Sequence, residues 1–174
     1  MSPDALNSLF SLCIGFALAG ALASGYQALV QRPAGTAHTV RMDLSDALAF
    51  IGNHDRTVLT TRRKDGRPQM SPVNSGVIDG VVCISSRAPL AKVHNIRRDP
   101  EVSMLVFTKA FFGSWVQIDG RAEIVDQPAA LDLLVTVYRT IAGEHPNWDE
   151  YRQAMVRDER VVIRIIPERA SGSL

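Results

Sequence analysis

A run of small polar and basic residues near the middle of the chain has the composition of a phosphate-binding site. Ser85, Ser86 and Arg87 follow a short apolar stretch, and Lys92 lies five residues further on, in a segment that Pro100 ends. The apolar stretch is typical of a strand and the following segment of a helix. The first amides of a helix are partially positive, and an arginine adds a bidentate pair of donors. The run therefore predicts binding of a phosphorylated cofactor.

A second polar segment precedes this run. Gln69, Ser71, Pro72, Val73 and Asn74 lie in one predicted strand. Proline cannot donate a hydrogen bond to a neighbouring strand, so Pro72 is expected at a sheet edge or a bulge. The polar side chains could offer hydrogen bonds to a flat heterocycle. The alternative is an ordinary edge strand with solvated polar side chains, and the residues by themselves leave both interpretations open.

The elements that must position these residues read as an antiparallel sheet with short helices. Two Asp-Gly pairs, at 65–66 and 79–80, predict tight hairpin turns. The expected strands are Thr57–Thr61, Gln69–Ile78, Val81–Ser86, Val102–Phe107, Ser114–Val125 and Arg160–Ile166, and the expected helices are Leu44–Ile51, Leu90–Arg98, Pro128–Ala142 and Asp149–Arg157. About six antiparallel strands with inserted helices predict a mainly β (α+β) fold, a closed or split β-barrel.

Length and composition bound the classes of function. The 174 residues suffice for one domain, expected over residues 36–174, with an appendage over residues 1–35. The chain has 19 basic and 18 acidic residues, so its formal net charge of +1 gives no reason to expect a nucleic-acid partner. Its four histidines are scattered, and Cys13 and Cys83 lie far apart, so no metal site is predicted.

The appendage contains Leu9–Val30, 22 residues without a charge, which is long enough to cross a bilayer as a helix. Arg32 and Arg41 follow it, so the domain is expected at the cytoplasmic face of a membrane, held by a single N-terminal helix. The alternatives are a cleaved signal peptide, a core helix, and a fused or mis-started segment on a soluble cytoplasmic protein.

Four segments in order carry a resemblance. They read DGRPQMSPV, SSRAPLAKVHNIRRDPEVSMLVF, WVQIDGRAEIV and RVVIRIIPER, and the similarity extends from about Asp43 to Ala170. This pattern resembles the pyridoxamine 5′-phosphate oxidase-like split β-barrel family, and within it the branch of F420-dependent oxidoreductases. The resemblance implies a homodimer with two cofactor sites at the subunit interface.

The resemblance also implies roles for individual residues. By it, the cofactor phosphate is bound by Ser85, Ser86, Arg87 and Lys92, and the ring is lined by Gln69, Ser71, Pro72, Val73 and Asn74. Trp115 and Gln117 would reach the ring, and Trp148 would lie near the partner subunit's site. For the last three, a structural aromatic or a satisfied surface amide is the competing interpretation.

The implied activity is hydride transfer from reduced F420 to a small organic substrate. The cofactor carries such chemistry, which accounts for a chain without an evident acid–base motif, and no catalytic residue is assigned. FMN is the alternative cofactor. Arg62, Arg63, Lys64 and Arg97 would favour the anionic tail of F420, unless they are simply solvated charges. Two other classes remain: a non-catalytic module that binds a flavin or haem, and a purely structural membrane-associated barrel.

Overall fold

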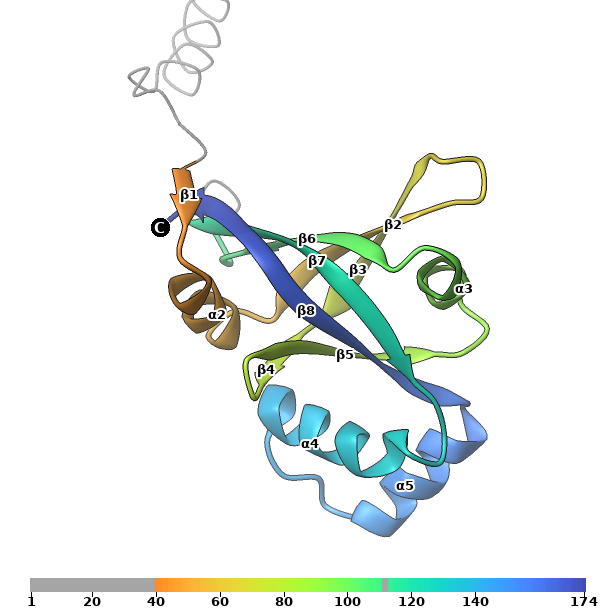
Figure 1. Ribbon diagram of the computed structural model, residues 1–174. Helices are drawn as coiled ribbons and strands as arrows, with labels where there is room; N and C mark the ends of the chain where they lie inside the picture. The colour runs from red at the N-terminus through yellow and green to blue at the C-terminus, as the bar shows by residue number, and fades with distance from the viewer. Residues whose placement is uncertain (1–39, 111–112) are drawn as a thin grey trace, which may run out of the picture. The chain divides into compact units, whose positions relative to one another are not determined.

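The computed structural model describes residues 40–110 and 113–174. Their elements, in chain order, are β1 (Val40–Met42), α2 (Leu44–Gly52), β2 (Arg56–Arg62), β3 (Pro68–Asn74), β4 (Gly76–Ile78), β5 (Val81–Arg87), α3 (Ala91–Arg98), β6 (Glu101–Phe107), β7 (Trp115–Val125), α4 (Ala130–Ala142), α5 (Trp148–Arg157) and β8 (Arg160–Ser173) (Figure 1).

The strands form one eight-stranded antiparallel sheet in the order β3-β2-β6-β7-β8-β5-β4, with β1 paired to the end of β8. The sheet curls so that β3, at one end of this order, comes close to β5. This arrangement, with helices between the strands, fits the predicted split β-barrel. Pro72 lies on β3, whose only ladder partner in the described chain is β2, so its expected place on an edge strand is confirmed.

Two strand predictions need correction, and one strand was missed. The expected strand Gln69–Ile78 is divided at Ser75, where the chain leaves β2 and begins to pair with β5. The last strand does not end before Pro167 but continues to Ser173, because a register shift in β7 puts Gly120 opposite Pro167 and the missing N–H falls at an irregularity. Strand β1 was not predicted.

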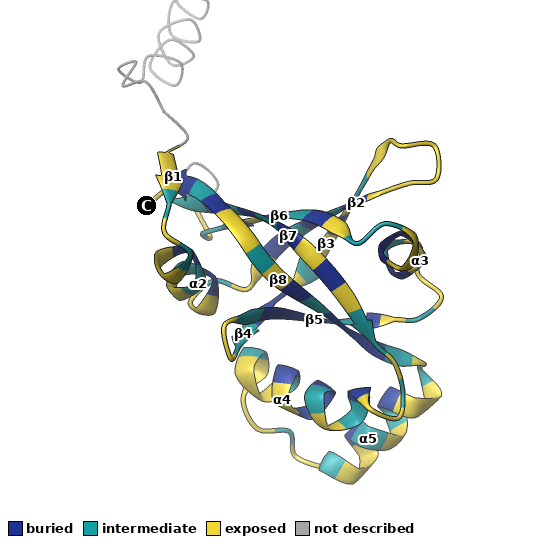
Figure 2. Cartoon of the chain, in the orientation of Figure 1, coloured by how far each residue is buried: buried dark blue, intermediate teal, exposed yellow. Residues whose placement is uncertain are grey.

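Two apolar clusters lie on opposite sides of β5 and β8. Val82 and Ile84 face the larger cluster, inside the curled sheet, while Cys83 faces a smaller cluster under α4 and α5. Side chains alternate across a strand, so adjacent residues of β5 pack in different clusters. Figure 2 shows the corresponding alternation of buried and exposed residues along the strands.

Helices α4 and α5 cover the second cluster (Figure 1). Leu134 and Val137 of α4 are buried there, and the hydroxyl of Tyr151 on α5 donates to the Leu134 carbonyl at 3.0 Å. Asn147 caps α5 by accepting a hydrogen bond from the Glu150 amide at 3.2 Å. The two helices therefore form a fixed wall beside β5.

The expected membrane helix Leu9–Val30 lies outside the described residues. Within residues 40–110 and 113–174, none of the helices combines the length and hydropathy needed to cross a bilayer.

Candidate functional site

Three basic side chains meet where β5 ends, α3 begins and β8 begins. Arg87 and Arg160 are partners in the β5–β8 register, and the Arg87 Nε donates to the Asp158 carbonyl at 3.4 Å. Lys92 lies in the first turn of α3. Burial lowers the pKa of Lys92, and the positive charge of Arg160 lowers it further. The sequence run that suggested a phosphate site thus leads to a corner of positive potential.

Arg160 was not singled out by the sequence, yet it lies at this corner with few partners. Its Nη1 donates to the Ser85 hydroxyl at 3.5 Å, and its Nε is buried without a hydrogen-bond partner in the described chain. Within the described residues, Arg160 forms no ion pair with a carboxylate, although nine other arginine–carboxylate pairs are present there. A partly buried guanidinium without an acid is costly unless an anion joins it.

A pocket of about 430 Å³ opens beside Arg160. It is lined by Asn74, Ser85, Arg160 and residues of the two wall helices, Val137, Tyr138, Ile141, Ala142, Tyr151 and Met155. Asn74 and Ser85 come from the two segments that the sequence suggested as halves of one groove, and the structure brings them to this pocket. Its lining combines one cation, several hydrogen-bonding groups and apolar walls, as ligand pockets commonly do.

The other predicted phosphate residues do not all lie on the side of β5 that faces this pocket. Ser85 points toward α4 and α5, whereas Ser86 lies on the barrel side of β5, where its buried hydroxyl has no hydrogen-bond partner among the described residues. The predicted ring residues divide in the same way. By strand alternation Gln69, Ser71 and Val73 face the barrel, and Pro72 and Asn74 face outward.

Gln69 and Ser71 belong to a hydrogen-bonded network with α3. The Asn95 side-chain amide donates to the Thr61 hydroxyl at 3.1 Å, and Thr61 lies 3.1 Å from the Gln69 amide oxygen. The Gln69 amide nitrogen lies 2.7 Å from the Ser71 hydroxyl. Asn95 and Thr61 are buried polar residues that sequence reasoning missed. The spacing of Asn95 from Lys92, three residues along one helix, is the signal that could have found Asn95.

Gln117 and Trp115 lie on the outer face of the sheet, away from the barrel core. A pocket of about 670 Å³ on this face includes Gln117, Asp119 and Arg169 among its lining residues. Burial alone would raise the pKa of Asp119, but hydrogen bonds from Ser103, Gln117 and Arg169 outweigh it and lower that pKa. The amide of Gln117 is therefore held by a carboxylate that is ionised at neutral pH.

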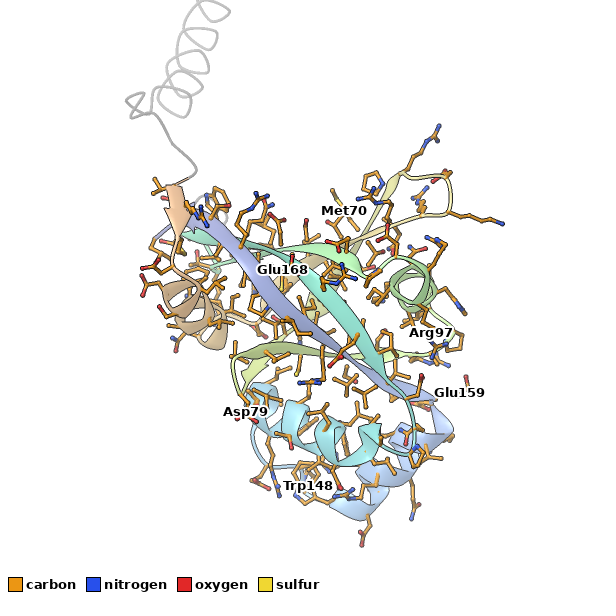
Figure 3. All side chains as sticks on the ribbon, viewed as in Figure 1. Met70, Asp79, Arg97, Trp148, Glu159 and Glu168 are labelled. Carbon is orange, nitrogen blue, oxygen red and sulfur yellow. The ribbon has the colours of Figure 1, made fainter. Side chains whose placement is uncertain are left out.

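Trp148 packs within an aromatic cluster on α4 and α5, and its ring nitrogen donates to Glu144 at 3.1 Å. Figure 3 shows it at the opposite end of the molecule from Met70, on the β2–β3 hairpin. Two of the cations expected to favour an anionic tail are paired: Arg62 with Asp99 at 3.1 Å and Arg97 with Asp126 at 2.5 Å. In the described parts of the chain, no three His, Cys, Asp or Glu side chains cluster as metal ligands would.

Comparison with known proteins agrees with this architecture. A family model described as pyridoxamine 5′-phosphate oxidase matches residues 45–173. Protein Rv2991 of Mycobacterium tuberculosis is 25% identical, with a TM-score of 0.64 over 78% of this chain and 87% of that chain. An F420 reductase is 21% identical, with a TM-score of 0.56 over 70% and 94% of the two chains. An FAD-binding protein of Mesorhizobium loti is 22% identical, with a TM-score of 0.53 over 76% and 93%. At the identities of the last two, the likeness concerns the fold alone.

Proposed function

The chain belongs to the pyridoxamine 5′-phosphate oxidase family, and on this basis we propose that it is an oxidoreductase that binds a flavin or a deazaflavin and reduces a small organic substrate. The observation that carries the proposal is the pocket beside Arg160, where a partly buried guanidinium without a carboxylate partner in the described chain adjoins both predicted halves of the cofactor groove. Among structures of similar fold are an F420 reductase and an FAD-binding protein, which supports this class of cofactor.

The residues present suit the phosphate of such a cofactor. Arg160 has an uncommitted buried N–H, Ser85 offers a hydroxyl beside it, and Lys92 adds a second positive charge. Phosphate oxygens would take the bonds that these donors lack and would offset the repulsion between the two cations. Arg87, exposed at the end of β5, would contribute from the solvent side.

The ring would extend from this corner along β3 toward Asn74. Of the predicted ring residues, Asn74 lines this pocket and Pro72 faces the same way, whereas Gln69, Ser71 and Val73 face the barrel; the wall of α4 would exclude water from the ring. A reduced flavin or deazaflavin supplies a hydride when bound. The protein's part is then to hold the two reactants in line and to keep the site dry.

We further propose that the outer face of the sheet packs against a second copy of the chain. Leu105 is 38% exposed there, next to Val58 on β2 and Gln117 on β7 in the strand register. An apolar strip bordered by polar groups is typical of a protein interface. In such a dimer Trp115 and Gln117 would reach the partner subunit's cofactor, as the family resemblance implies.

Titration of the full chain with F420 and with FMN, followed by ring absorbance and fluorescence, tests the proposal. We expect one of them to bind in the micromolar range or tighter, F420 being the first choice. Failure of both to bind would overturn the cofactor assignment. Binding without turnover of quinones, nitroaromatics or tetrapyrroles under reducing conditions would instead favour the alternative, a non-catalytic flavin- or haem-binding module.

A further inference from the structure

The pocket beside Arg160 has one aromatic wall, supplied by Tyr138 on α4 and Tyr151 on α5. The centroids of these two rings lie 5.1 Å apart and their planes meet at 62°, an edge-to-face packing. Burial raises the pKa of Tyr151, against an opposing effect of the Arg160 charge, so the guanidinium lies near this ring. The pocket therefore has an aromatic surface next to a positive charge.

The two tyrosines are not equivalent. Tyr151 is 8% exposed, and its hydroxyl donates to the Leu134 carbonyl at 3.0 Å, so its main role is to join the two helices. Tyr138 is half-buried, and two further rings contact it: His145 at 5.2 Å and 74°, and Trp148 at 5.8 Å and 88°. Among the described residues, every ring contact of Tyr138 is thus made at a steep angle, and no ring is stacked parallel to it.

An ionic clamp on the loop between α4 and α5 holds Trp148 beside Tyr138. Glu144 accepts from Arg139 through both carboxylate oxygens, at 2.9 and 3.4 Å, and from the Trp148 ring nitrogen at 3.1 Å. The Arg139 guanidinium also lies 4.6 Å from the centroid of the Trp148 ring, within the range of a cation–π contact. Arg139 directly follows Tyr138 in α4, and Trp148 is the first residue of α5. The neighbours that orient Tyr138 are therefore held in place themselves.

The other helix residues that line the pocket are not aromatic: Val137, Ile141, Ala142 and Met155. Such side chains accept a flexible chain or a puckered ring as readily as a flat one. A tyrosine ring is rigid and flat, and it favours another flat ring in an offset-stacked or edge-to-face arrangement. Since Tyr151 is committed to the helix packing, Tyr138 is the lining residue that can discriminate between these ligand shapes.

We propose that Tyr138 determines the specificity of this pocket, which takes a planar aromatic ring bearing an anionic group, with the ring against Tyr138 and the anion at Arg160. The inference rests on the proposed cofactor site and names the side chain that recognises the ring. Tyr138 touches the ligand in this assignment, whereas Trp148 and Glu144 are positioning residues. A flavin or deazaflavin with its phosphate meets both requirements.

Two small phosphate esters of similar size test the shape preference directly. Phenyl phosphate has a planar ring and cyclohexyl phosphate a puckered one, and both carry the same anionic group. Binding to the full-length protein is followed by the NMR shifts of the Ser85 and Arg160 amides, at the proposed anion position. We expect the wild type to bind phenyl phosphate about threefold more tightly than cyclohexyl phosphate, and Tyr138→Leu to bind the two alike. A wild type without this preference would overturn the inference.

Phe50 provides a matched control. It is also half-buried, and its ring lies 4.3 Å from that of a histidine, His54, but it belongs to α2 and does not line the pocket. Phe50→Leu should keep the preference for phenyl phosphate, as should Tyr138→Phe, which retains the ring. Trp148→Leu should reduce the preference and Trp148→Phe should restore most of it, because a phenyl ring can still pack against Tyr138. Equal losses in Tyr138→Leu and Phe50→Leu would contradict a specific role of Tyr138.

The wild-type complex gives a readout that needs no variant. In protein saturated with phenyl phosphate, NOEs should connect the ring protons of the ligand with those of Tyr138. Their absence would overturn the inference even if Tyr138→Leu failed to fold.

Titration of the same variants with FMN and F420 separates this inference from the proposed function. Tyr138→Leu should weaken binding of whichever cofactor the wild type binds by about tenfold. If a cofactor binds and Tyr138→Leu leaves its affinity unchanged, the inference fails and the proposed function stands. If neither cofactor binds while the phenyl preference and the NOEs are observed, the proposed function fails and the specificity of the pocket stands.

Discussion

Arg160 on β8 and Ser85 on β5 are diagonal neighbours in the strand register, and the 3.5 Å bond from Arg160 Nη1 to the Ser85 hydroxyl is a weak one for a partly buried guanidinium. The positive charge of Arg160 lowers the pKa of another cation, Lys92, so the two charges repel each other. Two like charges at a pocket store an unfavourable interaction that an anionic ligand would relieve. This relationship allows stability and binding to be separated by mutation.

Arg160→Met should leave the ligand-free protein as stable as the wild type or more so, while reducing cofactor affinity by about tenfold or more. The first effect follows from removal of a partly buried charge with few partners, the second from loss of a charged hydrogen bond worth about 1.5–3 kcal/mol. Arg152→Met is the control, because Arg152 on α5 is partly exposed and pairs with Asp132 at 2.8 Å. Thermal melting and cofactor titration are the measurements, and equal affinity losses in both variants would contradict the role of Arg160.

Lys92 should make cofactor binding depend on pH. The protonated amine binds a phosphate better than the neutral one, and the pKa of Lys92 is lowered, first by burial and then by Arg160. Affinity is therefore expected to fall as the solution is made alkaline, at a lower pH than an ordinary lysine would allow. Titrations across the alkaline range should show this fall in the wild type and a flat profile in Lys92→Met.

The same shift of the Lys92 pKa affects stability in the opposite sense. Between the lowered pKa and the ordinary value of 10.5, the unfolded chain binds more protons at Lys92 than the folded chain does. Its contribution to the free energy of unfolding therefore rises with pH across this window. Urea unfolding of the ligand-free wild type and Lys92→Met, at several pH values, should show this rise only in the wild type.

The Cys83 thiol should be unreactive in the folded protein. Burial raises the pKa of its thiol to about 11, so at pH 8 only about one molecule in a thousand carries the reactive thiolate, and that thiolate lies under α4 and α5. In a Cys13→Ser background, a thiol reagent should label Cys83 only after denaturant unfolds the chain. Rapid labelling under native conditions would contradict this burial.

Features set by neighbouring residues were predictable from the sequence. The Asp-Gly pairs locate the hairpins before β3 and β5, and the missing N–H of Pro72 places its strand at an edge. The two-residue period of a strand could also have separated Ser85 from Ser86. This period could not predict what each face of β5 packs against, because the α4–α5 wall comes from residues 130–157, far from β5 in the sequence.

The most informative site residues depend on contacts that are distant in the sequence. Arg160 reads as a solvated charge at a strand end until β8 is paired with β5 and its acid partners prove absent in the described chain. The Thr61–Asn95 bond joins positions 34 residues apart. The continuation of β8 past Pro167 requires the register shift at Gly120, on a different strand.

Gly120 should tolerate no side chain. A Cβ at this position would collide with the backbone carbonyl of Ile166 on β8, and backbone atoms in a paired strand cannot move aside. Gly120→Ala is expected to cost about 3 kcal/mol of unfolding free energy, whereas Gly52→Ala, with open space around its Cβ, should change it by less than about 1 kcal/mol. Denaturant unfolding of both variants checks this, and similar midpoints would refute the close packing of β7 on β8.

Leu105 on the outer face provides the test of the proposed dimer. Leu105→Arg should yield monomers, because a guanidinium at the centre of an apolar contact would be buried without a partner. Val156→Arg is the control: Val156 is 55% exposed, on α5, and lies away from the proposed contact, so this variant should stay dimeric with a similar free energy of unfolding. Analytical ultracentrifugation measures the oligomeric state, and cofactor titration measures the consequence. If Trp115 and Gln117 complete the partner subunit's site, the Leu105→Arg monomer should bind the cofactor more weakly than the dimeric Val156→Arg protein. A dimer that survives Leu105→Arg would show that subunits associate through another surface.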